Sequence, residues 1–138
     1  MCKREYEMNE QVRKAYDRFD ALVAKRLLEI RLLILELAEQ DDQIGKITET
    51  LKWGEPSYLT EQSKSGTTIR LSKVKDEANY CGIYVHCQTR LISEFRDSFA
   101  DVLEFSGNRA VLIDVSKPLK ETPVKMFLQK ALNYHLKS

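Results

Sequence analysis

The first 44 residues contain neither Gly nor Pro, and the hydrophobic period of the chain changes where this stretch ends at Gly45. Before Gly45, apolar residues recur at spacings of three and four, which is the period of an α-helix. This stripe comprises Val12, Tyr16, Phe19, Val23, Leu27, Ile30, Ile34 and Leu37. From Lys46 onward, β-branched and aromatic residues gather in short runs bounded by turn formers, as strands do. The chain is therefore predicted to begin as a long helix and to continue as a sheet.

A break in the helix is expected near residues 17–20. The apolar residues before it, Val12, Tyr16 and Phe19, allow two interpretations. They either cap the core of the chain's own fold or form half of a homodimer contact through the N-terminal helix.

Six later runs have the composition of strands, and they alternate with turns and two helical stretches. The predicted strands are 47–53, 57–60, 67–74, 80–87, 102–105 and 109–115. The polar segment 61–66 is expected to be a solvated hairpin loop. Thr89 is predicted to cap one helix, and Thr122 to cap a last helix with Pro123 at its first position. The predicted fold class is α+β, with an antiparallel twisted sheet of about five to six strands and the N- and C-terminal helices packed on one face.

Composition excludes several classes of protein. A formal net charge of +1 provides no overall field for nucleic acid or an anionic membrane, so neither partner is expected. The longest apolar run, 32–35, is too short to span a bilayer, and residues 1–6 lack the apolar segment of a signal peptide. Three Cys without a CxxC pair are typical of free thiols in a reducing compartment. These features predict a cytoplasmic location.

The segment Leu51-Lys52-Trp53-Gly54-Glu55-Pro56-Ser57-Tyr58-Leu59-Thr60 contains the only Trp of the chain, and its Gly and Pro favour a tight turn between two strands. It resembles the Trp-Gly-x-Pro-Ser-Tyr motif of the YdhG-like family, small bacterial domains of unknown function. The segments 84–91 and 106–112 strengthen the resemblance, which covers residues 19–137. The resemblance implies a single YdhG-like domain over 1–138, with 1–18 as an N-terminal helical extension. It brings no established reaction with it.

Six residues in or beside these motifs and the central strands are candidates for a ligand site: Trp53, Glu55, Tyr58, Arg70, His86 and Arg109. If the sheet curls, the two aromatic residues flank a groove that the arginines enter, and an anionic or carboxylate-bearing ligand fits there. Otherwise the aromatic residues plug the core, and the arginines pair with Glu55, Glu49 or Glu104. The favoured interpretation is a non-enzymatic binding module for a small ligand or a protein partner, with no catalytic residue, metal ligand or cofactor assigned.

Two alternatives remain open. Members of the YdhG-like family have been linked to frataxin-like iron chaperones, and acidic residues that could bind iron gather near the end of the long helix, at Glu29, Glu36, Glu39, Asp41 and Asp42. The same acids also suit a solvated surface. An enzyme using His86 or Cys87 is the second alternative, although adjacent residues in a strand point to opposite faces.

Overall fold

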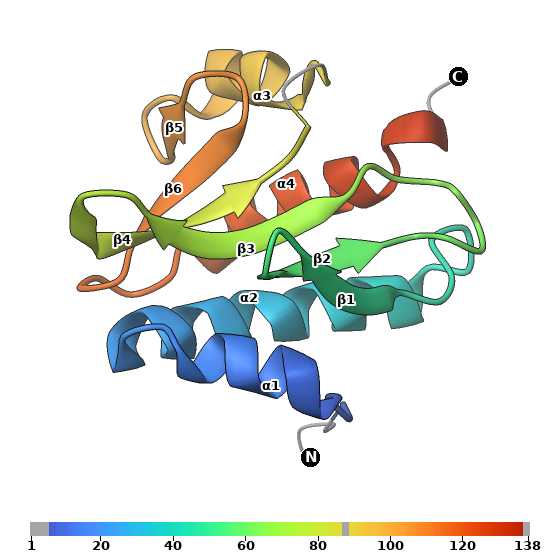
Figure 1. The fold of residues 1–138 in the computed structure, drawn as a ribbon. Helices are drawn as coiled ribbons and strands as arrows, with labels where there is room; N and C mark the ends of the chain where they lie inside the picture. Colours follow the sequence, from blue (N-terminus) through green and yellow to red (C-terminus); the bar gives the residue numbers. More distant parts are fainter. Residues whose placement is uncertain (1–5, 87–88, 137–138) are drawn as a thin grey trace.

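The computed structural model describes residues 6–86 and 89–136 (Figure 1). Its helices are α1 (Glu10–Asp17), α2 (Ala21–Gln40), α3 (Leu91–Phe99) and α4 (Glu121–Leu132), with a short helical turn η1 (Tyr134–Leu136). Its strands are β1 (Thr48–Lys52), β2 (Glu55–Leu59), β3 (Ile69–Val74), β4 (Glu77–Tyr84), β5 (Glu104–Ser106) and β6 (Ala110–Asp114). All strand pairs are antiparallel, in the order β1-β2-β3-β4-β6-β5. The predicted α+β class and strand number are confirmed.

The helices pack against one face of this open sheet, with α1 on β1 and β2, α2 on β3 and β4, and α4 against α2 and α3 (Figure 1). Alternate strand residues supply the buried face of the sheet, among them Ile69, Leu71, Ile83 and Val111. Because side chains alternate along a strand, their neighbours form a second face. Strand register aligns Ser57, Arg70 and Tyr84 across β2, β3 and β4 on that second face.

The predicted break in the first helix is confirmed, because α1 ends at Asp17 and α2 begins at Ala21. Asn9 caps α1 by accepting a hydrogen bond from the Val12 amide at 2.9 Å. Val12 and Tyr16 are only 1% and 3% exposed, so they pack into the core of their own chain. Of the two interpretations of this stripe, the structure supports the core for Val12 and Tyr16, whereas Phe19 is half-buried, and self-association through the N-terminal helix stays a prediction.

Both predicted helix caps are wrong. The helix α4 begins at Glu121 with Lys120 as its N-cap, which places Thr122 and Pro123 inside the first turn. Proline is tolerated there because the first amides of a helix have no partner within it. At α3 the N-cap is Arg90, and the Thr89 hydroxyl donates instead to the His86 carbonyl at 2.8 Å.

The segment 61–66 is only partly the solvated loop that was predicted. Ser65 is fully buried, and its hydroxyl donates to the Leu132 carbonyl at the end of α4 at 2.8 Å. A Cβ atom on Gly66 would lie 2.6 Å from the Leu132 backbone, so the loop contacts α4 at a distance that only glycine permits. The loop therefore fixes the C-terminal end of α4 against the sheet.

A chain of buried polar contacts joins α1 and α2 to the β1–β2 hairpin. Arg31 Nε lies 2.5 Å from Glu49 Oε2, which also accepts a hydrogen bond from the Tyr58 hydroxyl at 2.7 Å. The Tyr58 hydroxyl in turn lies 2.5 Å from that of Tyr16. Burial raises the pKa of both tyrosines well above the usual value. Burial alone lowers the pKa of Arg31, but the hydrogen bond and charge of Glu49 outweigh it, and the net shift is upward.

We predict that Glu49→Gln lowers the free energy of unfolding by about 3 kcal/mol, because the buried guanidinium of Arg31 then lacks its counter-charge. Urea unfolding followed by far-UV circular dichroism measures this change. Glu61→Gln in the exposed loop is the matched control and should change the free energy by less than about 0.5 kcal/mol. Equal stability of the two variants would contradict the stabilising role of the ion pair.

The two tyrosines also make stability depend on alkaline pH. Their pKa values are higher in the folded chain than the value of about 10 in an unfolded chain, so the unfolded state loses these protons first. Their contribution is complete below pH 10 and declines as the pH rises further. Urea unfolding between pH 8 and pH 11 should show a shallower decline for Tyr16→Phe than for the native chain. Equally steep declines in the free energy of unfolding would contradict the assignment of this pH dependence to the buried tyrosines.

Candidate functional site

Trp53 occupies a conformation that is unfavourable for its residue type. It forms the two-residue turn between β1 and β2 with Gly54, and both residues have positive φ, 56° and 75°. A turn of this kind favours Asn-Gly, whereas a bulky side chain at positive φ is strained by about 1–2 kcal/mol. Trp53 is also 90% exposed. Strain and exposure together make Trp53 a candidate for a functional residue.

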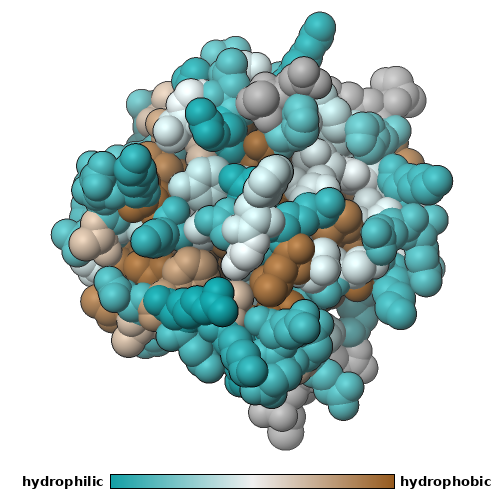
Figure 2. All heavy atoms as spheres, in the orientation of Figure 1, coloured by the Kyte–Doolittle hydropathy of each residue, from teal (hydrophilic) through white to brown (hydrophobic). Residues whose placement is uncertain are grey.

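Beside Trp53 lies a groove of about 220 Å³, on the sheet face opposite the helices. It is lined by Lys52, Trp53, Ser57, Thr68, Arg70, Tyr84, Val85 and His86. Figure 2, in the orientation of Figure 1, shows that weakly polar and apolar side chains gather over the middle of the strands, with hydrophilic side chains around them. We refer to this site as the Trp53 groove.

Arg70 is held in the Trp53 groove by two neighbours, Glu55 and Tyr84. Its Nε atom lies 2.6 Å from Glu55 Oε1, and the other oxygen of this carboxylate accepts a hydrogen bond from the Ser72 hydroxyl. The guanidinium carbon lies 5.2 Å from the centre of the Tyr84 ring, within the range of a cation–π contact. Glu55 therefore engages one side of the guanidinium, and the described contacts leave its two terminal nitrogens for a bound anion.

Tyr84 forms part of the groove wall because Gly82 leaves room for its ring. A Cβ atom on Gly82 would lie 2.6 Å from the Tyr84 ring, so a larger residue there would displace it. The Tyr84 hydroxyl donates to the Lys73 carbonyl at 3.1 Å, which fixes the far end of the side chain. Burial and then Glu55 raise the pKa of Tyr84, against the opposing effect of Arg70 and Arg109. The ring is thus a fixed, neutral surface.

The structure brings three of the six candidate residues, Trp53, Arg70 and His86, together in the groove. Glu55 adjoins them through its ion pair with Arg70. Tyr58 is fully buried on the helix-covered face, so its predicted position in the groove is wrong.

Arg109 is exposed and does not line the groove, although its carbonyl accepts a hydrogen bond from the Val85 amide at 2.8 Å. Sequence reasoning missed Lys52 and Tyr84 as lining residues. The alternation rule gives a signal for Tyr84, because it lies two residues before His86 and therefore shares its face.

The described residues lend little support to the two alternatives, an iron chaperone and an enzyme that uses His86 or Cys87. His86 is exposed just after β4, and Cys87 lies outside the described residues. Burial raises the pKa of the Cys81 thiol to about 12, which suppresses its reactive thiolate form. Within residues 6–86 and 89–136, no group of three or more His, Cys, Asp or Glu side chains is arranged to hold a metal ion. Of the predicted acids, Glu29 pairs with Arg26 at 2.7 Å.

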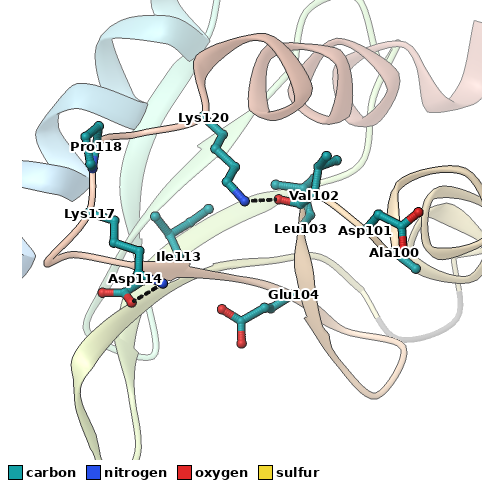
Figure 3. A pocket seen from close by; sticks show the side chains of 10 residues that line it. All are labelled: Ala100, Asp101, Val102, Leu103, Glu104, Ile113, Asp114, Lys117, Pro118 and Lys120. Atoms are coloured by element: carbon teal, nitrogen blue, oxygen red, sulfur yellow. Dashed lines mark hydrogen bonds and ion pairs between the residues drawn. The ribbon is translucent and has the colours of Figure 1, made fainter.

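A smaller hollow of about 140 Å³ lies between the end of α3, β5, β6 and the loop before α4 (Figure 3). Its two lysines already have partners. Lys120 Nζ donates to the Val102 carbonyl at 2.9 Å, and Lys117 Nζ lies 3.8 Å from Asp114 Oδ2. Figure 3 shows both lysines directed toward these partners. This hollow is therefore a weaker candidate for an anion site than the Trp53 groove.

No protein-family model, curated protein or solved structure matches the chain. In the described part of the chain, none of the helices combines the length and the apolar character needed to cross a membrane.

We predict that Trp53→Asn raises the free energy of unfolding by about 1 kcal/mol relative to Trp53→Ala, because Asn tolerates positive φ and Ala does not. Both variants remove the indole, so their difference isolates the backbone strain. Urea unfolding followed by circular dichroism provides the measurement. Equal stability of the two variants would contradict the claim that the positive φ at position 53 is unfavourable for residues other than Asn and Gly.

Proposed function

We propose that the protein is a non-enzymatic cytoplasmic binding module of the YdhG-like type, which holds a small anionic ligand in the Trp53 groove. The observation that carries this proposal is the exposed, strained Trp53 at the edge of a groove that also contains Arg70. A residue that is unfavourable for folding at its position is retained most simply because a ligand contacts it.

The groove residues fit a ligand with a carboxylate and a flat or apolar body. Lys52, Arg70 and His86 line the same hollow and supply hydrogen-bond donors, two of them permanently charged. The terminal nitrogens of a guanidinium bind a carboxylate by two parallel hydrogen bonds. The indole of Trp53 and the ring of Tyr84 offer flat surfaces for the rest of the ligand.

Two hydroxyls of the groove, those of Ser57 and Tyr84, are already engaged with backbone carbonyls, which supports binding rather than catalysis by these groups. Ser57 lines the groove, but its hydroxyl donates to the Glu55 carbonyl at 3.0 Å. A nucleophilic serine instead needs to donate to a general base. Ser57 is therefore not arranged as an activated nucleophile, and the proposed role of the groove is to bind and orient a ligand.

Because Trp53 is the only Trp of the chain, its fluorescence reports directly on the groove. We expect saturable quenching by an aromatic carboxylate such as benzoate, with benzyl alcohol as the uncharged comparison. Arg70→Gln should weaken benzoate binding by about tenfold, the effect of losing one charge-assisted contact.

Arg109→Gln is the matched control, since this arginine lies outside the groove lining, and it should leave the affinity unchanged within about twofold. Circular dichroism confirms that both variants are folded. Equal losses of benzoate affinity in Arg70→Gln and Arg109→Gln would contradict the assigned site. Equal quenching by benzoate and benzyl alcohol would contradict recognition of the anion.

A further inference from the structure

A second hollow of about 200 Å³ adjoins the Trp53 groove, because Thr68 lines both. It lies among the end of β2, the segment 61–66 and η1. The residues that bear on its chemistry are Leu59, Thr60, Glu61, Lys64, Thr68 and His135. We refer to it as the loop hollow. The groove and the loop hollow together form one elongated site.

The strand register gives the order of groups along this site. Trp53 forms the turn before β2, and Ser57 in the middle of β2 pairs with Arg70 of β3. Leu59 and Thr68 lie two positions beyond this pair, at the loop hollow. Trp53 is therefore at one end, Arg70 is in the middle and the loop hollow is at the other end. Successive side chains on one face of a strand are about 7 Å apart.

Lys64 of the loop hollow has a backbone conformation that disfavours its residue type. Its φ is 56°, in the left-handed region where glycine is the usual residue. The residues on either side hold the backbone in place. The Ser63 hydroxyl donates to the Ile44 carbonyl at 2.6 Å, and the Ser65 hydroxyl donates to the Leu132 carbonyl at 2.8 Å. A lysine at a fixed position that suits glycine is a candidate for a functional residue.

The placement of strained residues connects the two hollows. Among the described residues other than glycine, positive φ occurs at Trp53, Lys64 and Asp76. Aspartate tolerates this conformation because its short polar side chain forms local hydrogen bonds. The other two residues line the Trp53 groove and the loop hollow, respectively. The observation that marks Trp53 as a candidate ligand contact therefore also marks Lys64.

The side chains of the loop hollow can hold an anionic group. Lys64 is exposed, and none of the ion pairs between described residues includes its ammonium group. His135 adds an N–H donor. Glu61 is also exposed and lines the hollow, so its charge opposes an anion. An anion bound here must therefore contact the lysine directly.

We propose that the ligand of the elongated site is a dicarboxylate with a flat group at one end. The flat group contacts Trp53, one carboxylate binds Arg70, and the second carboxylate binds Lys64. This inference rests on the proposed function, because that function assigns the first carboxylate to Arg70. The chain between the carboxylates passes Thr68, which lines both hollows. A flexible chain of adipate length or longer spans the distance between these positions.

Fluorescence titration with 2-phenyladipate and 2-phenylsuberate tests this proposal. Each diacid is compared with its half ester, in which the carboxylate far from the ring is blocked by a methyl group. The better diacid should bind about fivefold more tightly than its half ester, because it gains one contact with an exposed charge. Lys64→Gln should reduce this ratio to about one, and Glu61→Gln should raise it by about twofold.

Lys75→Gln is the matched control, since this exposed lysine lies in the turn between β3 and β4 and outside both hollows. It should leave the ratio unchanged, and circular dichroism confirms that each variant is folded. Equal reductions in Lys64→Gln and Lys75→Gln would overturn the proposal in favour of attraction to net charge.

The remaining outcomes separate the second carboxylate from the groove itself. A ratio of about one for both diacids with the native chain would overturn the dicarboxylate, whereas saturable quenching by benzoate would still support the Trp53 groove. Absence of quenching by benzoate and by both diacids would contradict the proposed function, and the dicarboxylate would be overturned with it.

Discussion

The buried ion pair between Arg31 and Glu49 determines how the N-terminal helices meet the sheet. A buried carboxylate needs several donors, and Glu49 obtains them from the guanidinium of α2 and from the Tyr58 hydroxyl of β2. The same hydroxyl meets Tyr16, so α1 is aligned with the same point. One interaction thereby positions α1, α2, β1 and β2. The turn that carries Trp53 extends from this anchored hairpin, and its place beside the groove depends on the ion pair.

Side chains alternate along the strands between the helix-covered face, which forms the core, and the opposite face, which carries the Trp53 groove. Tyr58 faces the helices and completes the buried polar chain, whereas its neighbour Ser57 faces the groove. In β4, Ile83 belongs to the core and Tyr84 to the groove wall. Because all the helices lie on one side, residues on the other side are free of the packing demands of a core. That face can hold arginine and flat aromatic rings at little expense in stability.

The fold class could be predicted from the spacing of apolar residues along the chain. Both the helical stripe before Gly45 and the alternating runs after it arise from local backbone geometry. The groove was only partly predictable. Tyr58 was grouped with Trp53 because both belong to one motif, yet five residues and a tight turn place them on opposite faces. Lys52 and Tyr84 were missed, because the set of residues that lines the groove depends on the register between strands, which no period within a single segment records.

The near-zero net charge of the sequence conceals a local gathering of positive charge. Lysine and arginine alternate with acids along the chain, but folding places Lys52 and Arg70 beside the Trp53 groove. The electrostatic field of these few charges acts on a ligand within a few ångströms and is screened by salt beyond about 10 Å. Binding to nucleic acid requires cations that match many successive phosphates. The Trp53 groove offers few cations, and one of them is paired with Glu55. The same arrangement that suits a single carboxylate therefore disfavours a polyanion.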